Sequence, residues 1–204
     1  MKLLLTSNGL SSKKLEKVFI GLLEKKVEEN KILVIHTAQK TEHLLFVDSV
    51  GKEISRTGIL LPNITYLNIS QDIPKTNLSK YNIVYVCGGN TFFILDRIKK
   101  TGLEKFIKSF VKNGGIYVGV SAGSIIVGPD ISIAGEGSDG DSNYLNLKNL
   151  QGLNLTKFAT FPHYKTKLRK EVSEFKGKVN YPIEILKDGE ALQIFGGKNK
   201  KIVN

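Results

Sequence analysis

A serine between two glycines is the pattern in this chain that points most directly to chemistry. The pattern is Gly119-x-Ser121-x-Gly123. It follows an apolar run over 116–120 that predicts a strand, and it precedes a segment that predicts a short helix. A sharp strand-to-helix turn of this kind exposes a serine hydroxyl above the sheet edge. The sequence therefore predicts that Ser121 is a nucleophile, with the N–H of Ala122 at the helix start as a donor to an oxyanion.

A second glycine-rich segment, Cys87-Gly88-Gly89-Asn90-Thr91, also follows an apolar strand and precedes a helix. Loops at the carboxyl ends of parallel strands are where α/β proteins form their sites. We predict that the N–H of Gly89 is a second oxyanion donor, and that Asn90 or Thr91 caps the helix. A P-loop is excluded, because no Gly-Lys-Ser/Thr follows the glycines.

Three histidines are candidates for the base that takes the proton of Ser121: His36, His43 and His163. His36 ends a predicted strand, and His43 lies near the start of a predicted helix. His163 follows Pro162 at the end of another predicted strand. A serine nucleophile needs a base within hydrogen-bond reach, and the position at a strand end favours His163.

The acid that would orient His163 is left open by the residues alone. Asp188 and Glu190 lie in a turn between two predicted strands after the histidine. Further acids lie between the serine and the histidine, at Asp130, Glu136, Asp139 and Asp141. An acid on either side is compatible with a triad, because a triad is defined by geometry and not by chain order.

Apolar runs alternate with amphipathic stretches along most of the chain. Strands are predicted over 3–6, 32–36, 64–69, 83–87, 116–120, 158–161, 183–186, 191–195 and 202–203. Helices are predicted over 11–30, 91–100 and 103–112, and further helices begin at Thr41 and Ser121. This alternation predicts an α/β fold, a mostly parallel sheet flanked by helices, in one domain over 1–204. The glycine-rich segment 135–143 predicts a mobile lid that limits substrates to short peptides.

Composition sets the broad class of protein. The chain of 204 residues is 41% hydrophobic and 24% charged, which is ordinary for a soluble globular protein. A single cysteine excludes an intrachain disulfide and a cysteine metal cluster. The first apolar run is too short for a signal peptide, and no run is long enough to cross a membrane. We expect a cytoplasmic protein with no metal or organic cofactor.

The formal net charge of +11 leaves two interpretations open. Lysines spread over predicted helix faces account for the charge without a partner. The alternative is a non-catalytic basic protein that binds nucleic acid, but no aromatic–basic pattern supports it. We expect a monomer or homodimer with no nucleic-acid partner and no membrane contact.

Three motifs resemble peptidase family S51, which includes aspartyl dipeptidase (peptidase E) and cyanophycinase. They are Gly88-Gly89-Asn90-Thr91-Phe92, Gly119-Val120-Ser121-Ala122-Gly123 and Phe161-Pro162-His163-Tyr164. The resemblance spans most of the chain. It implies a class I glutamine amidotransferase-like (flavodoxin-like) fold with a nucleophile elbow. It also implies a dipeptidase-like serine peptidase that hydrolyses short peptides through an acyl-enzyme; the alternative is a serine esterase or amidase acting on non-peptide substrates.

The resemblance also implies roles for individual residues beyond the nucleophile. The family's general base falls on His163, and its oxyanion donors fall on Gly89 and Ala122. Its acid falls on one of two positions, Asp188 or Glu136. We favour Asp188 as the acid and expect Glu136 to be a substrate or structural contact.

One segment departs from the family. Aspartyl dipeptidases carry an arginine-containing segment after the histidine that resembles a recognition site for the substrate's aspartate. The corresponding segment here, 165–170, has the sequence Lys-Thr-Lys-Leu-Arg-Lys and does not match it well. Arg169 or a neighbouring lysine is the candidate to replace that arginine. A strict preference for N-terminal aspartate is therefore not expected.

Overall fold

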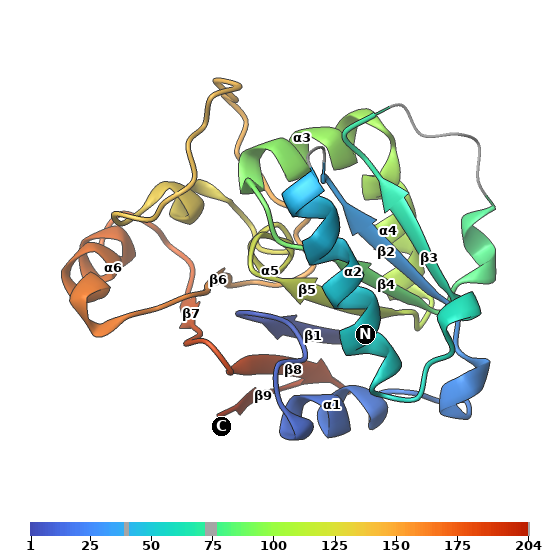
Figure 1. The fold of residues 1–204 in the computed structure, drawn as a ribbon. Helices are drawn as coiled ribbons and strands as arrows, with labels where there is room; N and C mark the ends of the chain where they lie inside the picture. The colour runs from blue at the N-terminus through green and yellow to red at the C-terminus, as the bar shows by residue number, and fades with distance from the viewer. Residues whose placement is uncertain (39–40, 72–76, 204) are drawn as a thin grey trace.

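A computed structural model gives the fold of the chain and describes residues 1–38, 41–71 and 77–203, without the side chains of 41–44 and 46. The central sheet contains β1 (Lys2–Thr6), β2 (Ile32–His36), β3 (Ile64–Asn68), β4 (Ile83–Val86), β5 (Ile116–Val120), β8 (Ala191–Phe195) and β9 (Lys198–Ile202). Their order is β3-β2-β4-β5-β1-β8-β9. The strands from β3 to β1 in this order are parallel, whereas β8 and β9 are antiparallel to their neighbours (Figure 1).

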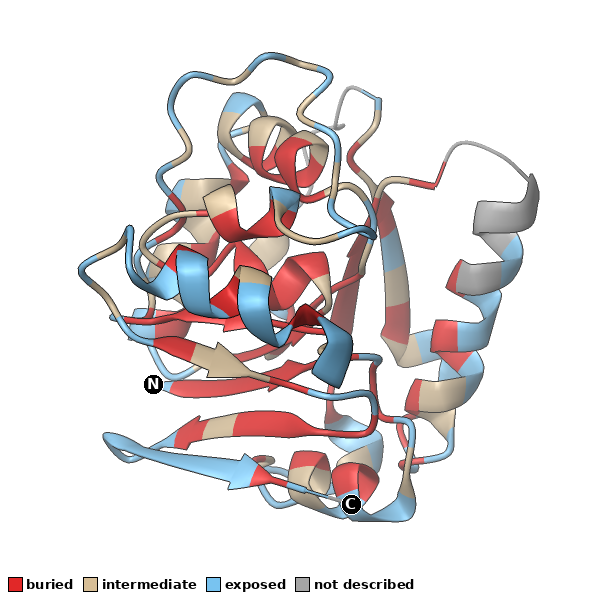
Figure 2. Ribbon diagram, turned by 90° about the vertical axis from the view of Figure 1, so that its left-hand side faces the viewer, coloured by how far each residue is buried: buried red, intermediate tan, exposed pale blue. Residues whose placement is uncertain are grey.

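The central strands are apolar on both faces, as parallel strands covered by helices on both sides must be. Every residue of β1, β2, β4 and β5 is buried, and these strands form the red centre of Figure 2. The edge strand β9 has the sequence Lys-Asn-Lys-Lys-Ile, and all but its last residue are exposed. Lysines on an edge strand oppose pairing with another chain.

Helices cover both faces of this sheet. The apolar cluster on one face includes residues of α1 (Lys13–Ile20) and α2 (Thr41–Ser55). The cluster on the other face includes residues of α3 (Thr91–Lys100), α4 (Leu103–Lys112), α5 (Ala122–Ile125) and α6 (Arg169–Lys176). Short 3-10 helices connect these elements: η1 (Val27–Glu29), η2 (Leu61–Asn63), η3 (Leu78–Lys80), η4 (Ser132–Gly135) and η5 (Thr166–Leu168). In the described part of the chain, no helix is both long and apolar enough to cross a membrane.

A separate pair of strands lies beside the central sheet (Figure 1). It consists of β6 (Ala159–Phe161) and β7 (Ile183–Ile185), which run parallel to each other. Because parallel strands end at the same edge, the segments that leave them start side by side. The segment after β6 carries His163, and the segment after β7 carries Asp188. This small sheet therefore brings together two residues that are far apart in the sequence.

The predicted fold class is confirmed, and most predicted elements lie within a residue or two of the observed ones. The helix predicted over 11–30 is wrong in length, because it ends at Ile20. Gly21 caps it, and glycine is a poor helix former. The last strand was predicted over 202–203 but begins at Lys198. Its polar residues carry no apolar signal, and its strand conformation depends on antiparallel pairing with β8.

Candidate active site

The predicted turn at Ser121 is present between β5 and α5. Ser121 has φ 51° and ψ −113°, a backbone conformation that is rare for residues other than glycine. A Cβ on Gly119 would lie 2.4 Å from the carbonyl oxygen of Gly123, and one on Gly123 would lie 2.3 Å from that of Val86. Both positions therefore need glycine for the backbone segments to pass this closely. This close packing explains the Gly-x-Ser-x-Gly pattern.

Hydrogen bonds hold the strained serine in place. The N–H of Ser121 donates to the carbonyl of Thr6 at 3.0 Å. The Ser124 Oγ lies 2.9 Å from the Thr6 oxygen and 2.7 Å from the Gly119 oxygen, and its proton is donated to this pair. Strained backbone persists only where its surroundings fix it. Hydrogen bonds to the end of β1 thus stabilise the turn that carries Ser121.

Ser121, His163 and Asp188 form a hydrogen-bonded chain, which we name the Ser–His–Asp chain. The Ser121 Oγ lies 2.9 Å from His163 Nε2, and His163 Nδ1 lies 2.7 Å from Asp188 Oδ1. With Nδ1 protonated and donating to the carboxylate, Nε2 is free to accept the serine proton. The side chains of His163 and Asp188 are 47% and 54% exposed, so water has access to the chain.

The surroundings of Asp188 favour its charged form. Partial burial acts to raise the pKa of this carboxyl, but hydrogen bonds from Ser7 and His163 outweigh that effect. The pKa of Asp188 is therefore lowered from its ordinary value. An acid that stays ionised can hold the imidazole in one tautomer and stabilise its protonated form.

Two residues that follow β1, Ser7 and Asn8, support the site although no sequence motif marks them. The Oγ of Ser7, a fully buried residue, donates to Asp188 Oδ1 at 2.7 Å and accepts from the His163 N–H at 2.8 Å. His163 has φ 54°, so the bond to Ser7 also supports an unusual backbone conformation. The Oδ1 of Asn8 accepts from the Gly189 N–H at 2.8 Å. Their place after a parallel strand was the available signal.

The glycine-rich loop after β4 passes next to the serine. A Cβ on Gly88 would lie 3.3 Å from the Cβ of Ser121. Ala122 begins α5, where N–H groups have no acceptor within the helix. Within the described residues, the N–H groups of Gly89 and Ala122 donate to no other protein group. Both are therefore available to an oxyanion beside Ser121.

Two other acids considered for the triad do not contact His163. The Oε2 of Glu190 accepts from the Lys187 N–H at 2.8 Å and lies 3.0 Å from Lys201 Nζ. Glu190 therefore stabilises its own turn and β9. Glu136 lines a cavity beside the Ser–His–Asp chain without contacting His163.

The basic segment after the histidine does not bring Arg169 to the site. Arg169 is exposed at the start of α6 and lines neither of the two cavities beside Ser121. Lys165 does line the smaller cavity, and its Nζ lies 3.5 Å from Asp139 Oδ2. Arg169 and a neighbouring lysine were the candidates to replace the family's arginine. The structure places the lysine, Lys165, at the cavity and leaves Arg169 outside it.

Of the other two histidines, the structure describes the side chain of His36, which has no hydrogen bond to Ser121. His36 ends β2, and its Nδ1 accepts from the Ala38 N–H at 3.2 Å. Burial lowers the pKa of His36, which keeps the ring neutral. The side chain of His43 lies outside the described residues.

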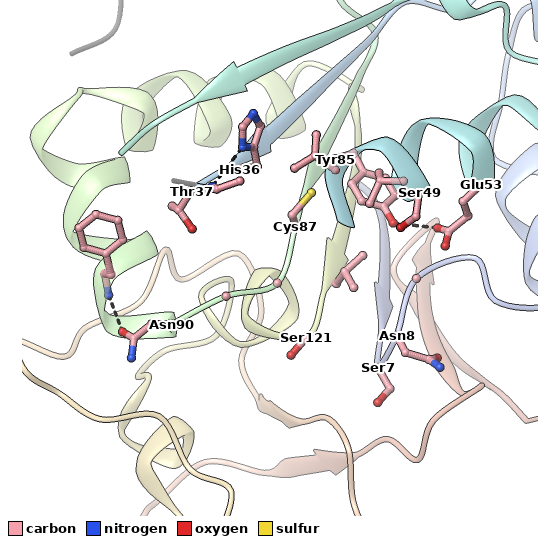
Figure 3. A pocket seen from close by; sticks show the side chains of 18 of the residues that line it. Ser7, Asn8, His36, Thr37, Ser49, Glu53, Tyr85, Cys87, Asn90 and Ser121 are labelled. Atoms are coloured by element: carbon pink, nitrogen blue, oxygen red, sulfur yellow. Dashed lines mark hydrogen bonds between the residues drawn. The ribbon is translucent and has the colours of Figure 1, made fainter. Parts of the chain in front are cut away.

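Two cavities meet at Ser121. The larger has a volume of about 790 Å³ and extends toward α2 and the ends of β1, β2 and β4 (Figure 3). The smaller has a volume of about 250 Å³ and lies beside η4 and the segment that follows it. Gly89, Ser121 and His163 line both.

The segment predicted as a lid forms a wall of the smaller cavity and is tied to α3. The Oδ2 of Asp141 accepts from the N–H and the hydroxyl of Thr91 at 2.8 and 2.6 Å. The Nδ2 of Asn90 donates to the Ser142 carbonyl at 2.9 Å, while its Oδ1 caps α3 through the Phe93 N–H at 3.0 Å. These bonds make the segment a fixed wall in this structure.

A serine on a strand-to-helix elbow, in contact with a histidine and an acid, is an arrangement found in hydrolases on more than one fold. The model of peptidase family S51 matches residues 3–202. The chain belongs to this family. Membership makes the protein a hydrolase of the peptidase class.

Individual relatives agree with this assignment. The chain is 35% identical to the uncharacterized peptidase Lmo0363 of Listeria monocytogenes over 167 residues, 78% of this chain and 81% of that protein. It is 27% identical to peptidase E of Streptomyces coelicolor over 135 residues, 61% of this chain and 54% of that protein. The crystal structure of a peptidase E-like protein from Listeria monocytogenes EGD-e superimposes with a TM-score of 0.77 at 30% identity, covering 98% of this chain and 97% of the other.

Proposed function

We propose that this protein is a serine peptidase that hydrolyses short peptides through an acyl-enzyme on Ser121. The observation that carries the proposal is the Ser–His–Asp chain, with 2.9 Å between Ser121 Oγ and His163 Nε2 and 2.7 Å between His163 Nδ1 and Asp188 Oδ1. A nucleophile, a base and an orienting acid in hydrogen-bond contact are what acyl transfer requires.

In the first half of the proposed reaction, Ser121 Oγ attacks the carbonyl carbon while His163 Nε2 takes its proton. The N–H groups of Gly89 and Ala122 donate to the tetrahedral oxyanion. Asp188 stabilises the protonated imidazole through Nδ1. His163 then transfers the proton to the leaving nitrogen, the C–N bond breaks, and an ester with Ser121 remains.

In the second half, water replaces the leaving amine. The Nε2 of His163 takes a proton from this water, whose oxygen attacks the ester carbonyl. Collapse of the second tetrahedral intermediate returns the proton to Ser121 Oγ and releases the new carboxyl group. The exposure of His163 and Asp188 supports this step, because water can reach the imidazole from the outside.

Labelling with a fluorophosphonate serine probe tests the nucleophile directly. We expect one label on the wild type and none on Ser121→Ala. Ser138→Ala is the matched control, because Ser138 is exposed and lines neither cavity beside Ser121; it should label like the wild type. Labelling that persists in folded Ser121→Ala would show that another residue is the nucleophile.

Peptide length tests the substrate class. We expect dipeptides and tripeptides to be hydrolysed faster than longer peptides of the same N-terminal sequence. The limited volumes of the two cavities and the tied segment beside the smaller one support this restriction. Rapid cleavage inside a long unfolded chain, or of p-nitrophenyl esters alone, would contradict it.

A further inference from the structure

The larger cavity contains a carboxyl group that the proposed reaction does not use. Glu53 on α2 lines the cavity together with Tyr85 and Ser121 (Figure 3). The cavity has a volume of about 790 Å³, which is within the usual range for small-molecule sites. Because the same cavity holds the reacting serine, a group bound near Glu53 belongs to the substrate.

Glu53 is held by contacts to one of its two oxygens. Oε1 accepts from the Leu10 N–H at 2.7 Å and from the Tyr85 hydroxyl at 2.8 Å. Among the described residues, no group donates a hydrogen bond to Oε2. One oxygen therefore fixes the carboxyl group, and the other has capacity left for a ligand.

The charges around the cavity favour a cation over an anion. Of the described residues that line it, Glu53 is the only acid, and none is a lysine or arginine. Arg56 lies near Glu53, but its Nε donates to Glu16 at 3.0 Å and the residue does not line the cavity. Burial raises the pKa of Glu53, while the bonds from Leu10 and Tyr85 act to lower it. A half-buried carboxylate without a cation is costly, and a bound ammonium group offsets that cost.

The loop after β1 contacts both Glu53 and the groups that hold His163. A Cβ on Gly9 would lie 2.8 Å from both Glu53 oxygens, and Gly9 has φ +84°, so this position needs glycine. Ser7, two residues earlier, bonds to His163 and Asp188. Because Glu53 and Ser121 line the same cavity, a substrate that is attacked by Ser121 can reach Glu53.

We propose that the larger cavity is a subsite for a cationic group of the substrate, with the Glu53 carboxylate as its acceptor. The group is an ammonium, either the peptide's free N-terminus or a lysine side chain; the inference rests on the proposed function. An aspartate side chain in this cavity would meet Glu53 with no compensating cation among the described lining residues. Peptides with a positive charge close to the scissile bond are the preferred substrates.

Binding to Ser121→Ala tests the subsite without depending on turnover. Calorimetry would compare Lys-Ala with norleucine-Ala, Asp-Ala and Nα-acetyl-Lys-Ala, in Ser121→Ala with and without Glu53→Gln. We expect Glu53→Gln to weaken Lys-Ala binding at least about tenfold, because either ammonium group loses its charged acceptor. If the lysine side chain is the group bound, Lys-Ala should also bind at least about tenfold more tightly than Asp-Ala. Glutamine keeps an oxygen for the Leu10 and Tyr85 donors. Asp48→Asn on the exposed side of α2 is the control for the loss of one charge.

The peptide panel separates the two sources of the ammonium group. If the lysine side chain is bound, norleucine-Ala binds weakly and acetylation has little effect. If the N-terminus is bound, norleucine-Ala binds like Lys-Ala and acetylation weakens binding. Both outcomes support the subsite, provided that Glu53→Gln removes the difference. Equal affinities for Lys-Ala with and without Glu53→Gln would overturn it, and so would equal affinities of Ser121→Ala for Lys-Ala, norleucine-Ala and Nα-acetyl-Lys-Ala.

Turnover of the same dipeptides by the enzyme with Ser121 intact tests the proposed function separately. Hydrolysis with no dependence on Glu53 leaves the peptidase proposal standing and rejects the cation subsite. Glu53-dependent binding without hydrolysis of any peptide rejects the serine-peptidase proposal and leaves the subsite standing. A melting curve for each variant shows whether it folds. If Glu53→Gln does not fold, the affinities of Ser121→Ala for Lys-Ala, norleucine-Ala and Nα-acetyl-Lys-Ala decide the case, and equal affinities for all three reject the subsite.

Discussion

Two carboxyl groups lie against the loop that follows β1, and their surroundings differ. Among the described residues, each accepts hydrogen bonds at one oxygen only. Asp188 is exposed, accepts from Ser7 and His163, and has a lowered pKa, whereas Glu53 is more buried and has a raised pKa. Ser7 contacts the first carboxyl group and Gly9 lies against the second. One short loop thus positions both.

The difference shows how one site can contain an acid that is fixed and an acid that is available. Asp188 accepts from the imidazole that it orients, and its side chain is 54% exposed, so water reaches its second oxygen. Glu53 is more buried and lines the larger cavity, and its second oxygen has no donor among the described residues, so that oxygen is available to a bound group. Partly satisfied buried polar groups cost stability and are found at functional sites.

Replacing the fixed acid should have the largest effect. We expect Asp188→Asn to lower kcat by about 10³- to 10⁴-fold, because asparagine no longer selects the imidazole tautomer or stabilises its charge. Steady-state assays on a dipeptide measure the loss. Asp48→Asn, the same change on an exposed surface, should stay near wild type. A loss below tenfold in Asp188→Asn would reject the role of Asp188.

Replacement of Ser7 tests how strongly the loop after β1 supports Asp188. We expect Ser7→Ala to lower kcat by about 10- to 100-fold through misplacement of His163 and Asp188, with little change in KM. Because the Ser7 donor lowers the pKa of Asp188, its loss should raise the pKa of that carboxyl group, which carbon NMR of Asp188 measures. Ser138→Ala, which removes an exposed hydroxyl elsewhere, is the control. An unchanged pKa of Asp188 would show that Ser7 has a structural role only.

The two acids should respond oppositely to pH in stability measurements. Asp188 has a lowered pKa, so it stabilises the fold above its ordinary pKa and loses that effect as pH falls; Asp188→Asn should be less stable than wild type near pH 7. Glu53 has a raised pKa, so its ionisation destabilises the fold as pH rises. Glu53→Gln should then melt higher at pH 8, by roughly 2–4 °C for about 1 kcal/mol, with the gain shrinking near pH 4. Differential scanning calorimetry across this range measures both, and shifts of the same sign would remove the contrast.

The thiol of Cys87 lines the larger cavity but is almost fully buried, and we expect it to play no part in the reaction. Burial raises the pKa of its thiol to about 12. At pH 8 we expect iodoacetamide to modify the native protein about 10³-fold more slowly than a free cysteine, because so little thiolate is present. Mass spectrometry of native and urea-unfolded protein measures the difference. Fast labelling of the native protein would show an open, reactive thiol.

Local sequence predicted much of this molecule correctly. The glycines around Ser121, the glycine-rich loop after β4 and the strand-end position of His163 are contiguous signals, and apolar periodicity located most strands and helices. The prediction for the first helix was too long, because apolar spacing continued beyond Gly21 while the helix did not. The pairing of β6 with β7 carried no local signal, although it brings His163 next to Asp188.

The sequence by itself determined the elbow, since its glycines are required by backbone contacts within a few residues and with the neighbouring strand. It also determined the fold class, because apolar runs buried on both faces alternate with amphipathic helices. Only the tertiary structure decided which acid meets His163, that Ser7 and Asn8 support it, and that Glu53 lines the larger cavity. Those contacts join residues far apart in the chain, and a side chain's partner across such a distance depends on the packing of whole strands and helices.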